Sequence, residues 1–235
     1  MEVSGLSQTM QNRSVFSEVR ASPSLAHFRA VFHSLAVVAE YEEPEAEGHL
    51  TRVSAYTSFL AAHVLLWPEL DAEHLGVAAL LHDIGKVAVP RALLLRPSSL
   101  SCEEHGLVRQ HVEAGHALLV RLEASFAAVE TDARLFQTAK DVARFHHENW
   151  DGSGYPHGLQ GEEIPLVARV VKLTDVIDAL LSHRPYKASW PWERVRAELV
   201  RLAGVHFDPA LVQGLFAHEE AFLQKVQIAM GEARE

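Results

Sequence analysis

Apolar residues recur at helical spacing along nearly the whole of this 235-residue chain, and no other feature constrains its fold as strongly. Capping residues and prolines separate the periodic segments, whereas the alternating pattern of half-buried strands is not found. A Gly-rich stretch at residues 149–161 predicts an ordered, tightly turning loop. We therefore expect an all-α fold, a helical bundle that carries one ordered loop.

The chain length fits one domain with a short addition. Residues 1–40 are expected to form a short N-terminal helical extension with a mobile start, because residues 1–21 are weakly patterned. Residues 41–235 form the main domain, which is large enough to bury a core without disulfides or a structural metal. A bound metal would therefore serve chemistry and not folding.

Individual residues mark where helices begin or end. Ser101 and Glu104 form a predicted capping box. Asp71 is expected to cap the N-terminus of another helix, and a further helix is expected to start near Asp208 and Pro209. Gly85 is expected to end the helix that Asp71 begins, in a left-handed conformation.

Composition indicates which binding partners and which cellular compartment to expect. The chain has 31 acidic and 21 basic residues, and this formal net charge of -10 disfavours general binding to nucleic acid or to an anionic membrane. The single Cys102 cannot form an internal disulfide, and the sequence contains no export signal or membrane-spanning run. We expect a cytoplasmic protein that binds neither nucleic acid nor membrane.

The chemistry is concentrated in histidines and carboxylates. His82 and Asp83 lie side by side where an apolar helix ends, and candidates of the same kind follow or precede them on other helices: Glu45, His49, His111, His146, His147 and Asp175. Neutral imidazoles and ionised carboxylates are ligands of Fe, Mn and Zn, and a set without thiolates argues against a structural zinc knuckle. The set predicts a catalytic metal site.

Each of these features has an ordinary interpretation when taken alone. His82 and Asp83 could be a hydrogen-bonded pair at a helix end, and the Gly-rich loop could be a surface turn. The segment at residues 184–187 could be a solvated connection. Their joint occurrence favours a functional site.

The motifs, taken in order, resemble those of the HD-GYP phosphodiesterases, a branch of the HD metal-dependent phosphohydrolases. The resemblance covers roughly residues 40–215 and rests on Glu45-x3-His49-x2-Arg52, His82-Asp83-Ile84-Gly85-Lys86, His111-x3-Gly115, His146-His147-Glu148, Asp151-Gly152-Ser153-Gly154-Tyr155-Pro156, Asp175-x2-Asp178-Ala179-Leu180 and Arg184-Pro185-Tyr186-Lys187. Each motif is weak alone. The departures, Asn149 and Val112, fall on no expected ligand.

The resemblance implies a helical HD domain that binds two or three divalent metal ions, commonly Fe or Mn. It implies hydrolysis of the bacterial second messenger cyclic di-GMP to linear pGpG, GMP or both. The implied ligands are the eight residues named above, with Asp83 as a bridge between two ions. Glu45 and His49 are similar to the residues of relatives that hold a third metal.

Metal binding lowers the pKa of water toward about 7, and this supplies hydroxide to attack phosphorus at neutral pH. Lys86 is expected to act with Asp83 in catalysis by neutralising a nonbridging phosphate oxygen. Arg184 and Lys187 are expected to hold the second phosphate of a two-phosphate substrate.

The remaining expected contacts lie around the pocket mouth. Gly154 is expected to allow close backbone approach, and Tyr155 to offer a flat face on which a guanine stacks. Arg52 is expected to contact phosphate, and Asp178 either to orient a ligand or to accept from guanine. The family also uses this loop in contacts with partner proteins.

Two other functions stay open from sequence alone. The metal core does not choose a base, so another cyclic dinucleotide or a nucleoside phosphate could be the substrate. A noncatalytic sensor or scaffold would use the Tyr155 loop to bind a partner. The amphipathic C-terminal stretch either closes the core or packs against a second subunit in a homodimer.

Overall fold

The structure is a computed structural model that describes residues 24–40, 46–96, 99–126, 133–183 and 188–232. Their α-helices are α1 (Leu25–Glu40), α2 (Ala46–His63), α3 (Glu69–Ala79), α4 (Arg91–Leu94), α5 (Cys102–Arg109), α6 (His111–Phe126), α7 (Ala133–Phe145), α8 (Leu166–Leu181), α9 (Trp192–Leu202), α10 (Pro209–Ala217) and α11 (Glu219–Glu232), and their 3-10 helices are η1 (Ile84–Ala88) and η2 (Gly161–Glu163). Within these ranges, extended pairing is limited to two isolated bridges. The prediction of an all-α fold is confirmed.

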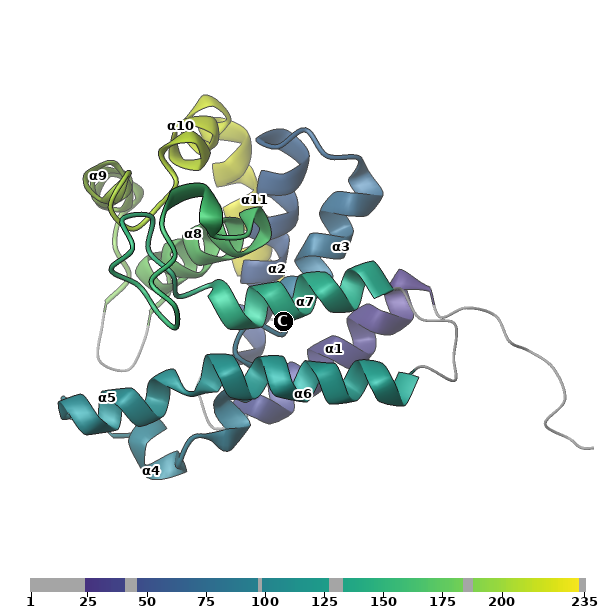
Figure 1. Cartoon of the computed structure of the whole chain (residues 1–235). Coiled ribbons are helices and arrows are strands. Elements are labelled where there is room, and N and C mark those ends of the chain that lie inside the picture. The colour runs from purple at the N-terminus through teal and green to yellow at the C-terminus, as the bar shows by residue number, and fades with distance from the viewer. Residues whose placement is uncertain (1–23, 41–45, 97–98, 127–132, 184–187, 233–235) are drawn as a thin grey trace, which may run out of the picture.

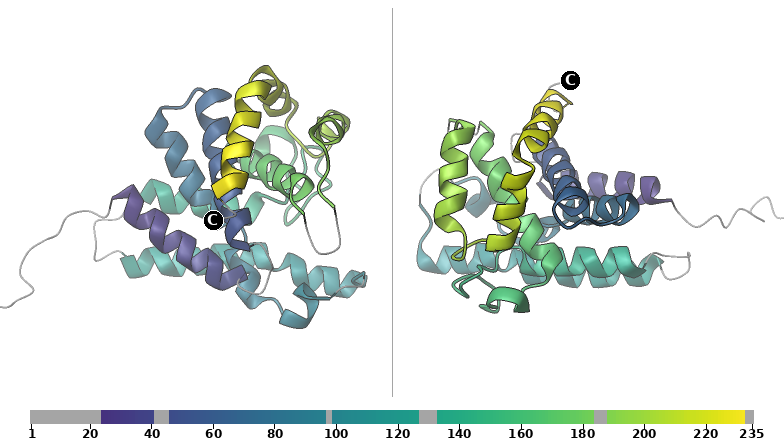
Figure 2. Two further views of the ribbon diagram at one scale, coloured as in Figure 1. Left: turned by 180° about the vertical axis from the view of Figure 1, so that it is seen from behind. Right: turned by 90° about the horizontal axis from the view of Figure 1, so that it is seen from above.

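The helices enclose two apolar clusters, one on each side of α3 and α7. One cluster joins α2 and α8 to the three C-terminal helices, where Tyr56 packs edge-on against Phe222 of α11. The other joins α1, α3, α6 and α7, where Phe32 packs against Phe136 with ring centroids 5.5 Å apart. Burial of such a side chain contributes about 1.5–3 kcal/mol. Figure 1 shows α6 and α7 side by side and antiparallel, and Figure 2 shows the C-terminal helices on the opposite side of α2 from α1.

Helix α1 is fastened to this second cluster by aromatic residues. Phe28 and Phe32 are buried, and both pack against Phe136 of α7. The predicted domain boundary at residue 40 stays a prediction, because residues 41–45 lie outside the described ranges. The packing nevertheless fixes the C-terminal end of α1 next to the start of η1.

The predicted capping box and one predicted helix start are confirmed, and two other boundary predictions are wrong. Ser101 and Glu104 form the capping box of α5, and Asp208 accepts from the amide of Ala210 at the start of α10. Helix α3 begins at Glu69, so Asp71 lies inside its first turn and is not its cap.

Gly85 does not take the predicted left-handed conformation, because α3 has already ended at Ala79 and Gly85 lies within η1. A Cβ at this position would lie 1.9 Å from the carbonyl oxygen of His111. Glycine is required here because η1 packs directly against the backbone of α6. The tertiary contact, and not a turn conformation, explains the residue.

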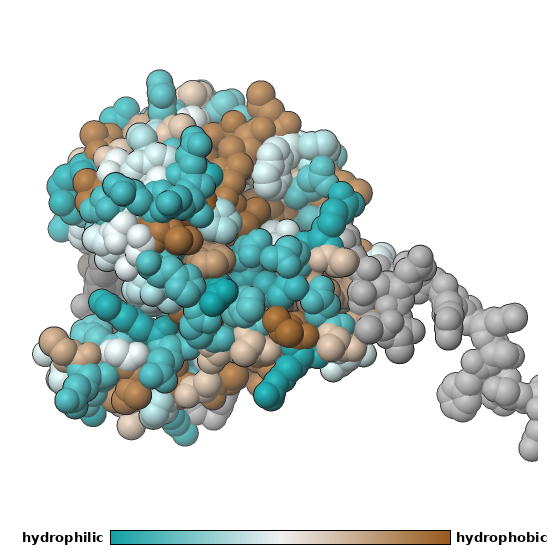
Figure 3. Space-filling view, in the orientation of Figure 1, coloured by the Kyte–Doolittle hydropathy of each residue, from teal (hydrophilic) through white to brown (hydrophobic). Residues whose placement is uncertain are grey.

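The surface agrees with a helical protein of mixed polarity. Figure 3 shows hydrophilic side chains interspersed with smaller hydrophobic areas on the face seen in Figure 1. Among the described residues, no helix combines the length and apolar character needed to cross a membrane.

Candidate metal centre

Seven of the eight predicted ligands come together between the two apolar clusters. They form two groups of ligand atoms, each within 4.8 Å of one another: Asp83, His111, His146 and His147 in group A, and His49, His82 and Asp175 in group B. The groups adjoin, because the Nε2 atom of His82 lies 3.5 Å from Nε2 of His49 and 3.3 Å from Oδ2 of Asp83. Side chains far apart in sequence therefore converge on one centre.

Most of these ligands stand at helix ends. His82 and Asp83 occupy the turn between α3 and η1, His111 is the first residue of α6, and His146 and His147 follow α7 directly. His49 and Asp175 lie within α2 and α8. The antiparallel packing of α6 and α7 brings the start of one helix beside the end of the other, and this places His111 next to His146.

The backbone fixes the orientation of three imidazoles in the same way. The Nδ1 atoms of His82, His111 and His146 lie 2.9, 2.8 and 3.0 Å from the carbonyl oxygens of Ala79, Val108 and Val142. Because a carbonyl only accepts, each Nδ1 must carry a proton, and in the neutral ring Nε2 then carries the lone pair. Metal-binding histidines are held in this manner, with the ring nitrogen that does not bind metal donating to a carbonyl or carboxylate.

Group A contains buried polar atoms without hydrogen-bond partners. These atoms are Oδ1 of Asp83, Nε2 of His111 and Nε2 of His146. Oδ1 lies 3.1 Å from the first nitrogen and 3.5 Å from the second, but the geometry is not that of a hydrogen bond. Buried polar atoms are rarely left unsatisfied. Electron-pair donors that face one another at these distances fit a shared cation, so the residues present suit the metal that the sequence predicts.

The protonation states also suit metal binding. Burial lowers the pKa of His146 and holds that of His147 well below its usual range, so both are neutral near pH 7. Burial would raise the pKa of Asp83, but Lys86 and His82 hold it well below its usual value. Burial likewise opposes charge on His82, yet the nearby carboxylates, Asp83 foremost, raise its pKa to about 10. The carboxylates therefore favour positive charge at the junction of the two groups.

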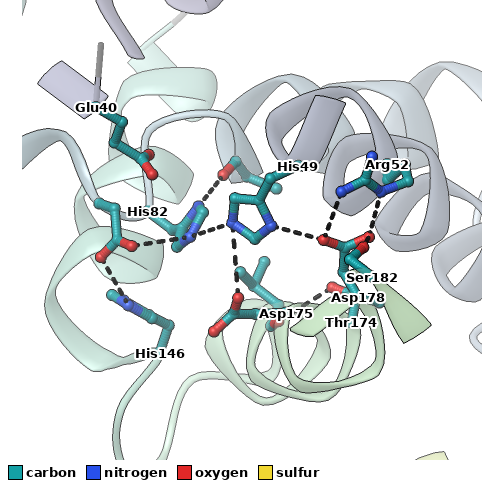
Figure 4. Close-up of polar contacts among 12 residues, drawn as sticks. Glu40, His49, Arg52, His82, His146, Thr174, Asp175, Asp178 and Ser182 are labelled. Carbon is teal, nitrogen blue, oxygen red and sulfur yellow. Dashed lines mark hydrogen bonds and ion pairs between the residues drawn. The ribbon is translucent and has the colours of Figure 1, made fainter. Parts of the chain in front are cut away.

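A buried ion pair orients His49. The imidazole Nδ1 donates to Oδ2 of Asp178 over 2.8 Å, while the Arg52 guanidinium donates to both oxygens of Asp178 over 2.6 and 3.2 Å. Figure 4 shows His49 between this pair and Asp175. Arg52 and Asp178 are 4% and 0% exposed, so we assign them to ligand support instead of the substrate contacts predicted from the sequence. The alternative prediction, that Asp178 orients a ligand, agrees with this geometry.

Lys86 lies beside the centre, where two carboxylates of the described residues contact it. Its Nζ atom is 2.8 Å from Oδ2 of Asp83 and 3.3 Å from Oε2 of Glu40 at the end of α1. Sequence reasoning missed Glu40, because a single acidic residue at the end of an apolar helix carries no signal of its own.

The Gly-rich loop supports the centre from outside. Tyr155 stacks on His147 with ring centroids 4.7 Å apart and an interplanar angle of 22°. The guanidinium of Arg109 lies over the same tyrosine ring, 4.9 Å from its centroid. The ring predicted to stack on a guanine thus already contacts a ligand and a cation. Arg109 was not among the predicted site residues.

The backbone of this loop is tied to the histidine pair. The buried carboxylate of Glu148 accepts from the amides of His157 and Leu159 over 2.7 and 3.1 Å. A Cβ on Gly154 would lie 2.2 Å from the amide nitrogen of Asn149. The close approach predicted for Gly154 is therefore made to the chain itself.

Three predicted site residues cannot be placed. Glu45, the expected ligand of a third metal, lies outside the described residues, as do Arg184 and Lys187, the expected clamp on the second phosphate. Their roles remain predictions.

Comparison with known proteins agrees with this geometry. The family model of the HD domain matches residues 34–211. The chain is 39% identical over 83% of its length to 3'3'-cGAMP-specific phosphodiesterase 2 of Vibrio cholerae, and 38% identical over 81% of its length to a cyclic di-GMP phosphodiesterase of the same organism. It spans only 35% and 39% of those two relatives.

A solved structure shares the fold. The crystal structure of a cyclic GMP-AMP specific phosphodiesterase of V. cholerae superimposes with a TM-score of 0.55 at 20% identity, over 83% of this chain and 50% of that one. The chain belongs to the HD domain family, whose members are metal-dependent hydrolases, and within it to the HD-GYP branch.

Proposed function

We propose that this chain is a metal-dependent phosphodiesterase that hydrolyses cyclic di-GMP to linear pGpG, GMP or both. The observation that carries the proposal is the pair of adjoining ligand groups that meet at His82 and Asp83. Two neighbouring divalent ions are the arrangement that phosphoryl transfer commonly uses. The name of the second relative supports the same activity.

Each of the two ligand groups would hold one metal ion. Group A would hold one ion and group B a second, with Asp83 next to both. Imidazole with carboxylate suits Fe or Mn, and Glu45 would extend group B to a third ion. When bound, the ions supply hydroxide at neutral pH and stabilise the attacking and leaving oxygens of the phosphodiester.

The protein's own groups then position the substrate. The Lys86 ammonium lies beside Asp83, where it can donate to a nonbridging phosphate oxygen as negative charge grows. At the loop, the exposed Arg109 makes no ion pair with any residue that the structure describes, so its guanidinium is available to a phosphate or a guanine edge. Arg184 and Lys187 would hold the second phosphate.

Turnover by the purified chain tests this proposal. Protein loaded anaerobically with Fe or Mn should convert cyclic di-GMP to pGpG or GMP, followed by liquid chromatography. The Asp83→Ala variant should form neither product. An inactive chain with both metals, each shown to be bound, would contradict the proposal.

A second candidate substrate is 3'3'-cGAMP, because a relative of 39% identity is named for it. Both dinucleotides present two phosphates and at least one guanine, so the metal groups cannot separate them. Competition between the two substrates decides, since the preferred one has the higher kcat/KM. Stable binding of either without cleavage would instead indicate a sensor or a scaffold that binds a partner through the Tyr155 loop.

A further inference from the structure

Glu40 is a buried acid beside the metal centre that belongs to neither ligand group. Its side chain is 1% exposed. Glu40 is the last residue of α1, and aromatic packing holds this helix in place. One oxygen, Oε2, lies 3.3 Å from Lys86 Nζ, and the other, Oε1, is buried without a hydrogen-bond partner. Figure 4 shows Glu40 and Asp178 on opposite sides of the histidine cluster.

A carboxylate in this position needs a reason, because burial disfavours its charge and raises the pKa of Glu40. The Lys86 ammonium is the main influence that opposes this shift, because its positive charge favours the ionised carboxylate. Lys86 itself is 17% exposed and therefore reaches toward solvent from between the two carboxylates.

The two carboxylates that hold Lys86 are not equivalent. Asp83 has both oxygens directed at histidines of the metal centre, with Oδ1 near His111 and Oδ2 near His82. Electron density that Asp83 gives to metal ions is withdrawn from its contact with Lys86. Glu40 stands outside both ligand groups, so its hold on the ammonium does not compete with metal binding.

We propose that Glu40 is a positioning residue that keeps the Lys86 ammonium beside Asp83, where it can donate to a phosphate oxygen of the substrate. The inference deepens the proposed function and rests on it for the role of Lys86. Glu40 itself touches neither substrate nor metal and acts only through the lysine.

A double-mutant cycle isolates this role. Glu40→Gln keeps the shape of the side chain and an accepting oxygen but removes the charge, so it should fold. We expect its kcat/KM for cyclic di-GMP to fall by about 10- to 100-fold, the scale of a displaced catalytic group. In a Lys86→Met background the same change should have little effect, because the group that Glu40 positions is already gone.

The chain offers a matched control in Glu123 and Lys140, an ion pair of the same residue types that joins α6 to α7 over 2.9 Å. Glu123→Gln should leave kcat and KM unchanged. A wild-type kcat/KM in Glu40→Gln would overturn the proposal, and so would an undiminished loss in the Lys86→Met background.

Two readouts do not depend on turnover. Acylation of Lys86 by a soluble ester reagent, followed by peptide mass spectrometry, should be several-fold faster in Glu40→Gln than in wild type and unchanged in Glu123→Gln. Metals bound per chain should be equal in Glu40→Gln and wild type, and a lost ion would make Glu40 a ligand and overturn the proposal. If the wild-type chain cleaves no cyclic dinucleotide, the proposed function fails. Equal labelling of Lys86 in Glu40→Gln and wild type would separately show that Glu40 does not position Lys86.

Discussion

Two buried ion pairs flank the metal centre, and they differ in what their cations can reach. Asp178 receives two hydrogen bonds from Arg52 and one from His49, and the Arg52 and Asp178 side chains are 5% and 0% exposed. Lys86 rests between Glu40 and Asp83 with its side chain 17% exposed. The sealed pair can act only on a ligand, whereas the open pair places a cation where a substrate can meet it.

The same difference separates stability from function. A buried ion pair is seldom a large net source of stability, but loss of one partner leaves an uncompensated charge. The Arg52–Asp178 pair is retained, in this interpretation, because it fixes the direction in which His49 presents Nε2 to group B. The Lys86–Glu40 pair is retained because it fixes the position of a charge.

The largest effect is expected from Asp83→Ala, which removes the carboxylate that contacts Lys86 and histidines of both ligand groups. Oδ1 faces His111 and His146, and Oδ2 faces His82 and Lys86. We expect loss of bound metal and of turnover, measured by metal analysis and product formation. Asp141→Asn, at a half-buried aspartate of α7 that accepts from Gln137, should change neither quantity.

Asp178→Ala should break the sealed pair alone. The buried Arg52 would lose the Asp178 carboxylate, at a cost of about 3–5 kcal/mol in the free energy of unfolding. Metal affinity of group B should fall by about 10- to 100-fold, because His49 loses the acceptor for Nδ1–H. Urea unfolding and metal titration measure the two effects.

The Arg169–Asp208 pair provides the control for this variant, because its 2.7 Å contact is also largely buried but involves no ligand. Asp208→Ala should lower stability and leave metal affinity intact. Equal metal affinities in Asp178→Ala and wild type would show that Asp178 does not orient His49.

The pH dependence of the sealed pair has a defined sign. The pKa of Asp178 lies below its ordinary 3.8 in the folded chain, because hydrogen bonds from His49 and Arg52 outweigh the opposing effect of burial. The stability that the ionised carboxylate contributes is therefore complete above pH 3.8 and is lost as pH falls below it. The difference in unfolding free energy between wild type and Asp178→Asn should be constant from about pH 7 to 5 and narrow below about pH 4. A difference that shrinks already between pH 7 and 5 would contradict this assignment.

The smallest effect on metal binding is expected from substitution of Tyr155. This residue sharpens the comparison, because it orients His147 by ring packing and not by an ion pair. Within the described part of the chain, the His147 ring makes no hydrogen bond, and Tyr155 stacks on it. Aromatic pairs contribute about 0.5–1.5 kcal/mol, so Tyr155→Ala should weaken metal binding in group A by about 2- to 10-fold. Tyr155→Phe keeps the ring and should bind metal as wild type does, whereas equal weakening in both variants would implicate the hydroxyl.

The sequence predicted which side chains gather in the two groups, but not the contacts that surround them. His49, His82, Asp83, His111 and His146 are of the right chemical kind for ligands wherever the chain brings them, so residue type identified them. The residues that hydrogen-bond to these side chains cannot be recognised by residue type in the same way. Arg52 was expected to contact phosphate, and Asp178 either to orient a ligand or to accept from guanine. Spacing along a helix left this open, because it shows which residues share a face but not whether another helix covers that face.

The unpredicted contacts share a physical cause. Glu40 of α1 reaches Lys86 across 46 positions of sequence, and Arg109 of α5 reaches Tyr155 in the loop after α7. Gly85 was interpreted as a local turn, although its function is to admit the backbone of α6. Each contact arises between segments whose distance is set by packing and not by local spacing.

Residue types and helical periodicity by themselves determined that the chain is all-α and that it carries oxygen and nitrogen donors suited to a metal site. These properties follow from local backbone preference and from ligand chemistry, which each segment carries with it. Only the tertiary structure decided that seven ligands form two adjoining groups, that one ion pair is sealed and the other open, and that Glu40 belongs beside Lys86. Those outcomes depend on burial and on distances between helices, and no segment contains that information alone.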